Sequence, residues 1–170
     1  MSNIYPPDSA CIAIGKAVIA AQMLETVLIP VFEVFRIHTE SGHLEKTGGY
    51  ITEGAWKVPV RNIVKRLSER GSLAPDFEQR INALMENRHE LVHRWFQKNG
   101  STDESAPLGV ARLINLATSV EAEALELMRM LAGYMVKYAN PEWSASNMAE
   151  YRQRMVEIFQ RAHLDFDPAQ

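Results

Sequence analysis

The spacing of apolar side chains is the feature of this sequence that most constrains its fold. Apolar residues recur three or four positions apart along almost every extended stretch, and convincing polar–apolar alternation is absent. A repeat of about 3.6 residues gathers such side chains on one face of a helix, whereas a half-buried strand requires alternation. The sequence therefore predicts an all-α protein.

The length and composition fit a single helical domain. A chain of 170 residues can bury roughly 70% of its unfolded surface without disulfides or metals. Hydrophobic residues make up 46% and charged residues 23%, which excludes largely disordered, collagenous and membrane-embedded chains. We expect residues 1–170 to form one up-and-down bundle, with a core at about 10–139 and an additional C-terminal helix within 140–170.

Helix start and stop signals divide the chain into about five helices. Pro30 is expected to kink or divide the first helix, because proline lacks the N–H and clashes with the preceding turn. Four glycines between residues 39 and 56 predict an irregular connection, with a short extended piece at Tyr50–Thr52. The expected helices run from Ser9 to His38, from about Pro59 to Gly71, from Asp76 to Lys98, from 108 to 139, and from about Ser144 to His163.

A cytoplasmic location is expected from three features. The chain has one cysteine, Cys11, as suits a reducing compartment. A basic segment typical of a signal peptide does not precede the first apolar stretch. The longest apolar run, Val18–Phe35, is interrupted by polar residues and a proline, which we interpret as too polar for a membrane span.

Charge is unevenly distributed. The net charge is -3, yet residues 57–98 carry nine Lys or Arg against five Asp or Glu. Mixed charges of this kind are typical of a solvated helical face, and a phosphate-facing surface is the alternative.

Two charged residues fall within apolar helical faces. Arg88 occupies the centre of the stripe of the third helix, and Glu25 occupies a slot in the stripe of the first. A buried guanidinium is costly unless it is paired, so we predict that Arg88 and Glu25 approach each other. His89 and His93 lie at the edge of the stripe. An ideal helix does not point Arg88 and His93 in one direction, so a joint site needs a bent side chain, a local distortion or a second copy of the chain.

The segment His89-Glu90-Leu91-Val92-His93 matches the HExxH pattern of zinc hydrolases. Two imidazoles four residues apart can chelate a metal, and the glutamate between them can act as general base. The metzincin continuation is absent after His93. A zinc enzyme would need a third ligand, for which the candidates are Glu104, Glu121 and Glu123.

A second pattern overlaps the first. Arg88, four residues and His93 on one helix, together with the element Ala21-Gln22-Met23-Leu24-Glu25 on an opening helix, resemble the HEPN superfamily of small all-α domains. The resemblance covers roughly residues 10–135. His89 stands where the superfamily more often has Asn or Asp.

The resemblance implies a metal-independent endoribonuclease that needs no cofactor and acts as a homodimer. In that scheme His93 performs acid/base catalysis, and Arg88 stabilises charge on the phosphoryl oxygens. Glu25 and His89 support them, Arg94 and Lys98 contact RNA, and Trp95 or Phe96, if either is exposed, stacks on a base. From its position in the apolar stripe of the helix, Trp95 is expected to belong to the core. Other superfamily members are non-catalytic interaction modules or components of toxin–antitoxin and phage-defence systems, so an antitoxin or another protein is a further candidate partner.

Two alternatives from the residues alone stay open. Arg88 and Glu25 can form a purely structural ion pair, with His93 an ordinary interfacial histidine. Independently of the resemblance, the helix near Leu125–Met135 is apolar around much of its circumference, which predicts a dimer interface or a loosely filled core.

Overall fold

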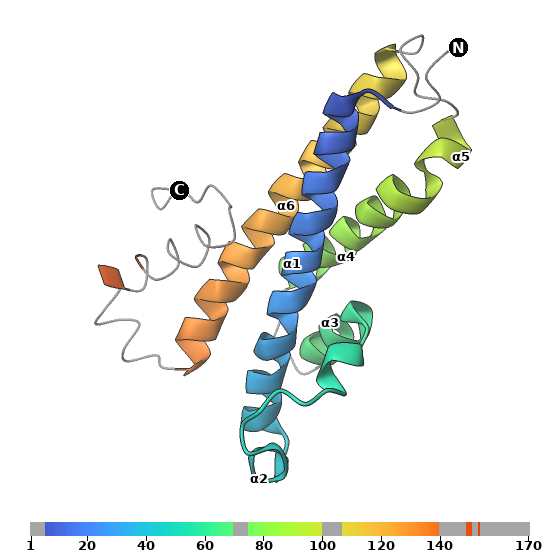
Figure 1. The fold of residues 1–170 in the computed structure, drawn as a ribbon. Coiled ribbons are helices and arrows are strands. Elements are labelled where there is room, and N and C mark those ends of the chain that lie inside the picture. The colour runs from blue at the N-terminus through green and yellow to red at the C-terminus, as the bar shows by residue number, and fades with distance from the viewer. Residues whose placement is uncertain (1–5, 70–74, 100–106, 140–148, 151–152, 154–170) are drawn as a thin grey trace. The chain divides into compact units, whose positions relative to one another are not determined.

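The structure, a computed structural model, describes residues 6–69, 75–99, 107–139, 149–150 and 153 (Figure 1). These residues contain helices and no strand, which confirms the all-α prediction. The chain divides into two compact units, residues 1–129 and 130–170. The first unit holds every residue of the candidate site.

Helix α1 (Asp8–Thr39) is continuous through Pro30, so this proline does not divide the helix, which was one of the two outcomes predicted for it. Its buried face includes Ala21, Leu24, Leu28 and Phe32. α1 also contains an 18-residue window of mean hydropathy 1.8, of which 44% is buried inside the protein. By length and composition α1 could therefore cross a membrane, and its polar interruptions do not exclude this. The core helix of a soluble protein meets the same criterion.

The connection after α1 contains more structure than expected. A short helix α2 (His43–Thr47) lies between Gly42 and Gly48, whose φ angles of 75° and 61° suit glycine. A 3-10 turn η1 (Ala55–Lys57) follows, and no secondary structure is assigned at residues 50–52, where the sequence predicted an extended piece. The sequence did not predict α2 or η1, because each is too short to show a helical repeat.

The remaining helices lie close to their predicted bounds. They are α3 (Val60–Glu69), α4 (Pro75–His89), a π-helical turn η2 (Glu90–Arg94), α5 (Trp95–Asn99) and α6 (Pro107–Ala139). The sequence predicted one uninterrupted helix over α4, η2 and α5. The expected helix from about Ser144 to His163 lies almost wholly outside the described residues.

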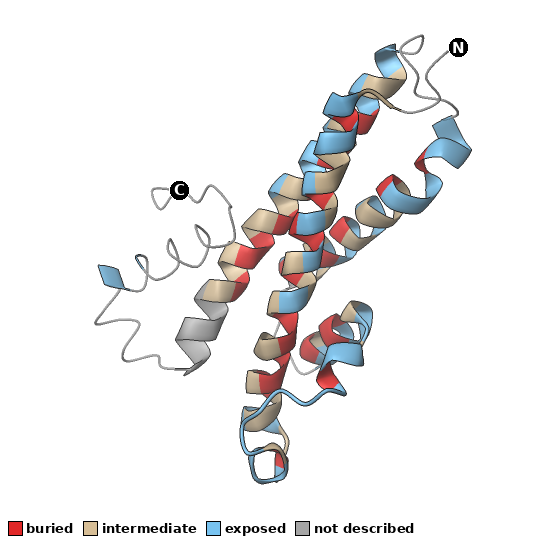
Figure 2. Cartoon of the chain, viewed as in Figure 1, coloured by how far each residue is buried: buried red, intermediate tan, exposed pale blue. Residues whose placement is uncertain are grey.

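The core of the first unit lies between α1, α3, α4 and α6 (Figure 2). α1 contacts α2, η1, α3 and α4, and α3 contacts α4. Between α4 and α6, Arg80 binds both carboxylate oxygens of Glu123 at 2.6 and 3.1 Å, which raises the pKa of Arg80. The largest fully buried side chains of this unit are Phe32, Phe77, Leu24, Leu28, Ile63, Ile81, Leu84, Leu113, Leu127 and Met128. Leu127 and Met128, two residues of the apolar stretch Leu125–Met135, belong to the core of the chain, as in the alternative of core filling.

Candidate functional site

The motif helix carries a π-helical turn at the place where the two chemical patterns overlap. η2 spans Glu90–Arg94 and contains His93. A π turn bonds each carbonyl to the fifth residue ahead instead of the fourth, and such turns are rare and concentrate at functional sites. This turn is a local distortion of the kind that a joint Arg88 and His93 site requires. The sequence did not reveal it, because the buried series Phe77, Ile81, Leu84, Leu91 and Trp95 runs through it at ordinary helical spacing.

Arg88 and Glu25 approach each other as predicted. Arg88 Nη1 lies 3.9 Å from Glu25 Oε1, and the two side chains are 29% and 31% exposed. At this distance the pair is an ion pair without a hydrogen bond. Arg88 Nε is buried and has no hydrogen-bond partner among the described residues. The guanidinium therefore keeps donor capacity that Glu25 does not use.

His89 and His93 form a ring pair beside Arg88. Their ring centroids are 5.0 Å apart and the planes are inclined by 46°. His93 is exposed and His89 is half-buried. No described residue forms a hydrogen bond or ion pair with either ring, so their nitrogens are available to a ligand.

Most of the basic residues between 57 and 98 are neutralised by carboxylates, which favours the solvated-face interpretation of this segment. Arg70 lies outside the described residues. Arg94, next to His93, is exposed and has no ion-pair partner in the described part of the chain. The pairs are Lys57–Glu53, Arg61–Glu86, Lys65–Glu69, Arg66–Glu40, Arg80–Glu123, Arg88–Glu25 and Lys98–Glu90.

Arg94 and Lys98, the two residues predicted to contact RNA, therefore differ in their ion pairing. Lys98 is held by Glu90 of the π turn, so its charge is partly compensated. Arg94 is exposed, and none of the residues that the structure describes pairs with its guanidinium. Two apolar side chains of the same segment are also exposed: Val92 is 41% exposed and Phe96 is 49% exposed. Trp95 is buried, as predicted, and its indole N–H has no partner among the described residues.

A zinc hydrolase would need a third protein ligand, and the described residues supply none for a site at His89 and His93. Within the described residues, no group of three or more His, Cys, Asp or Glu side chains could hold a metal ion. Glu123 binds Arg80, and Glu104 lies outside the described residues. The HExxH pattern here supplies two imidazoles on a helix without the third protein ligand typical of catalytic zinc.

A second polar cluster was missed by sequence reasoning. Glu33 is 4% exposed and binds His43 Nε2 through Oε2 at 2.9 Å. Its other oxygen accepts a hydrogen bond from Arg36 Nη1 at 3.0 Å. Glu40 accepts hydrogen bonds from Arg36 Nε at 3.0 Å and from Arg66 Nη2 at 2.7 Å. The available signal was the acid at position 33 inside an apolar run, but its histidine partner lies on α2, which the sequence did not predict.

The electrostatics of this cluster favour the charged forms of Glu40 and Arg36. Burial opposes ionisation of Glu40, but the hydrogen bond from Arg36 and the charges of Arg36, Arg66 and His43 outweigh it, so the pKa of Glu40 is lowered. Burial likewise opposes the charge of Arg36, and Glu40 and Glu33 together raise its pKa. Each charge thus has a partner, and the cluster fastens α2 and α3 to α1.

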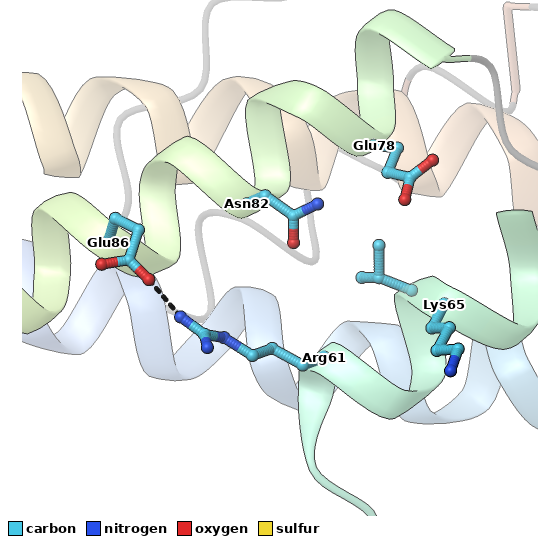
Figure 3. Close-up of a pocket in the computed structure, with 6 residues that line it drawn as sticks. Arg61, Lys65, Glu78, Asn82 and Glu86 are labelled. Atoms are coloured by element: carbon cyan, nitrogen blue, oxygen red, sulfur yellow. Dashed lines mark hydrogen bonds and ion pairs between the residues drawn. The ribbon is translucent and has the colours of Figure 1, made fainter.

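A groove of about 430 Å³ opens between α3 and α4 (Figure 3). It is lined by Arg61, Val64, Lys65, Glu78, Asn82 and Glu86. Arg61 reaches across to Glu86 at one end of it. Neither Arg88 nor His93 lines this groove, so it is separate from the candidate site.

Comparisons with known proteins assign no family to this chain. No family model matches the sequence, and no curated protein or solved structure matches it.

Proposed function

We propose that this protein is a metal-independent endoribonuclease that acts as a homodimer through Arg88 and His93. The observation that carries the proposal is the π turn Glu90–Arg94, which bears an exposed imidazole, without a partner in the described part of the chain, one turn beyond a half-buried arginine. Beside them stands Arg94, a cation without an ion-pair partner among the described residues. The resemblance to the HEPN superfamily supplies the reaction class.

The chemistry follows from the groups present. His93 accepts the proton of a ribose 2′-OH, and the 2′-oxygen then attacks the adjacent phosphorus. The P–O2′ bond forms, the P–O5′ bond breaks, and the 5′-oxygen takes up a proton from the imidazolium of the second copy. Arg88, whose Nη1 lies 3.9 Å from Glu25 without a hydrogen bond, stabilises the charge on the phosphoryl oxygens. Glu25 positions Arg88, and His89 orients His93 or contacts RNA.

Substrate binding fits the surroundings of the site. Arg94 supplies a phosphate contact, and Phe96, exposed on the same helical segment, supplies a surface on which an unpaired base stacks. Lys98 makes a smaller contribution because Glu90 competes for it. The RNA that fits is therefore single-stranded at the cleavage point. The setting we propose is a cytoplasmic toxin–antitoxin or phage-defence system, in which an antitoxin would restrain the enzyme.

A non-catalytic interaction module is the second candidate. Val92 and Phe96 present apolar surface next to His93, and exposed apolar groups of this kind mark protein contacts. In this case the same surface would bind a partner, and His93 would be replaceable.

Cleavage of an RNA with structured and single-stranded parts, in excess EDTA, tests the proposal. We expect wild-type protein to cleave and His93→Ala to lose at least about a hundredfold in rate, the usual contribution of general acid–base catalysis. His38→Ala is the matched control, because His38 is an exposed histidine on α1 outside the site. Circular dichroism verifies the fold of each variant.

The remaining outcomes separate the candidates. Equal cleavage by wild type and His93→Ala would show that a contaminant or another site cuts the RNA. Absence of cleavage with retained binding of a protein partner would favour the interaction module. Arg94→Ala should weaken RNA binding more than Arg61→Ala, because Glu86 already neutralises Arg61.

A further inference from the structure

The ring separation of the two histidines of the candidate site is that expected of a metal chelate. A metal ion bound by imidazole lies about 2.0–2.1 Å from the ring nitrogen, hence about 3.2 Å from the ring centroid. Two such rings at a tetrahedral angle have centroids about 5.2 Å apart. The observed separation of His89 and His93 is 5.0 Å. The separation of the two rings therefore matches that of two imidazoles bound to one ion.

The surroundings leave this pair free to bind. Neither ring has a hydrogen-bond or ion-pair partner among the described residues, in contrast to His43, which Glu33 engages. His93 is exposed, so an ion can enter from solvent. Glu90, which lies between the two histidines in sequence, is bound to Lys98.

From these observations we propose that His89 and His93 form a two-histidine site for a divalent transition-metal ion of the Zn²⁺, Ni²⁺ or Cu²⁺ class. Imidazole suits these ions, and water completes the coordination. With two protein ligands the site is not that of a zinc hydrolase, which has three. It binds one ion per chain, reversibly.

Bound metal has a direct consequence for catalysis, and this consequence rests on the proposed ribonuclease function. An imidazole nitrogen that coordinates a metal cannot accept a proton. An ion at His89 and His93 would therefore inhibit cleavage, and chelators would restore it. Metal would act on this enzyme as an inhibitor and not as a cofactor.

Isothermal titration of the full chain with ZnCl₂, after chelator treatment and desalting, tests the site without any RNA. We expect one Zn²⁺ per chain. His93→Ala and His89→Ala should each weaken binding by about tenfold or more, since even an outer-shell partner is worth that much. His38→Ala and Cys11→Ser are the controls, because each removes an exposed candidate ligand elsewhere, and both should bind as wild type does.

Two results would overturn the proposal. One is Zn²⁺ binding that neither histidine variant weakens, which would place the ion elsewhere. The other is a stoichiometry of one ion per two chains, which would replace the single-chain chelate by a shared site. His93→Ala changes an exposed residue, so loss of the fold is not expected to obscure the result. Cleavage in excess EDTA is measured separately, so failure of either proposal is distinguishable from failure of the other.

Discussion

Among individual residues, Glu33 and His43 bear most on stability. Both are buried, at 4% and 6% exposure, and each would be costly without the other. Arg36 and Arg66 close the cluster, and both guanidinium groups lie over the ring of Phe32, at 5.8 and 4.9 Å from its centroid. The chain after α1 is thus held by charge at a point where apolar side chains are few.

Removal of one buried partner should be strongly destabilising. Glu33→Ala leaves His43 and Arg36 without their shared carboxylate, so we expect the free energy of unfolding to fall by about 3–5 kcal/mol. Glu53→Ala breaks an exposed pair with Lys57 and should cost at most about 1 kcal/mol. Urea denaturation at neutral pH measures both. Similar losses in the two variants would show that the buried cluster is not a source of stability.

Glu40 gives the cluster a pH dependence of definite sign. Its pKa is lowered in the folded protein, so its contribution to stability is present above the pKa of an unfolded glutamate. That contribution is lost as the pH falls through the lower folded value. The stability difference between wild type and Glu40→Gln should therefore be largest near pH 7 and shrink below about pH 4. Urea denaturation from pH 3 to 7 checks this, and a difference independent of pH would contradict it.

Among the elements, the π turn is the one that positions the site, and two buried side chains hold it. Leu91 within the turn and Trp95 just after it are 3% and 7% exposed, whereas Val92 is 41% exposed. The turn is anchored on its inner side and open on the side that carries His93. An anchored distortion of this kind can hold a reactive group at the surface without loosening the helix.

Replacement of Leu91 by alanine tests whether this side chain anchors the π turn. Leu91→Ala should lower the free energy of unfolding by about 2–5 kcal/mol, as is usual for a buried leucine. Val92→Ala, at the next position, should stay within about 0.5 kcal/mol of wild type. Thermal and urea denaturation provide both values. If the two substitutions cost the same, Leu91 is not the residue that fixes the turn.

The contrast between α1 and the π turn shows what the sequence could predict. The bounds of α1 and α6 followed from three- and four-residue spacing and from the prolines and glycines beside them. The approach of Arg88 to Glu25 followed from two charges placed in apolar faces. The π turn did not follow, because the spacing from Leu91 to Trp95 is the same in an ordinary helix. α2 did not follow either, because the contact between His43 and Glu33 that holds it is tertiary.

For the whole molecule, the question is what covers the outer face of the site. Leu127 and Met128, which lie in the apolar stretch Leu125–Met135, are buried in the chain itself. Val92 and Phe96 remain exposed beside His93. A second copy bound there would desolvate the imidazole and bring two motifs together, as the proposed reaction requires.

A charge at this surface should therefore separate the copies without unfolding them. We expect the wild type to have twice the mass of the 19.2 kDa chain by light scattering, and Phe96→Glu to be monomeric and inactive in RNA cleavage. Phe96 is half-exposed, so the substitution should change stability by only about 0.5 kcal/mol. Tyr50→Glu alters an aromatic residue that is 79% exposed and distant in sequence, and it should remain dimeric and active. A monomeric wild type that cleaves RNA would instead mean that one chain holds the complete site, and that Phe96 serves the RNA alone.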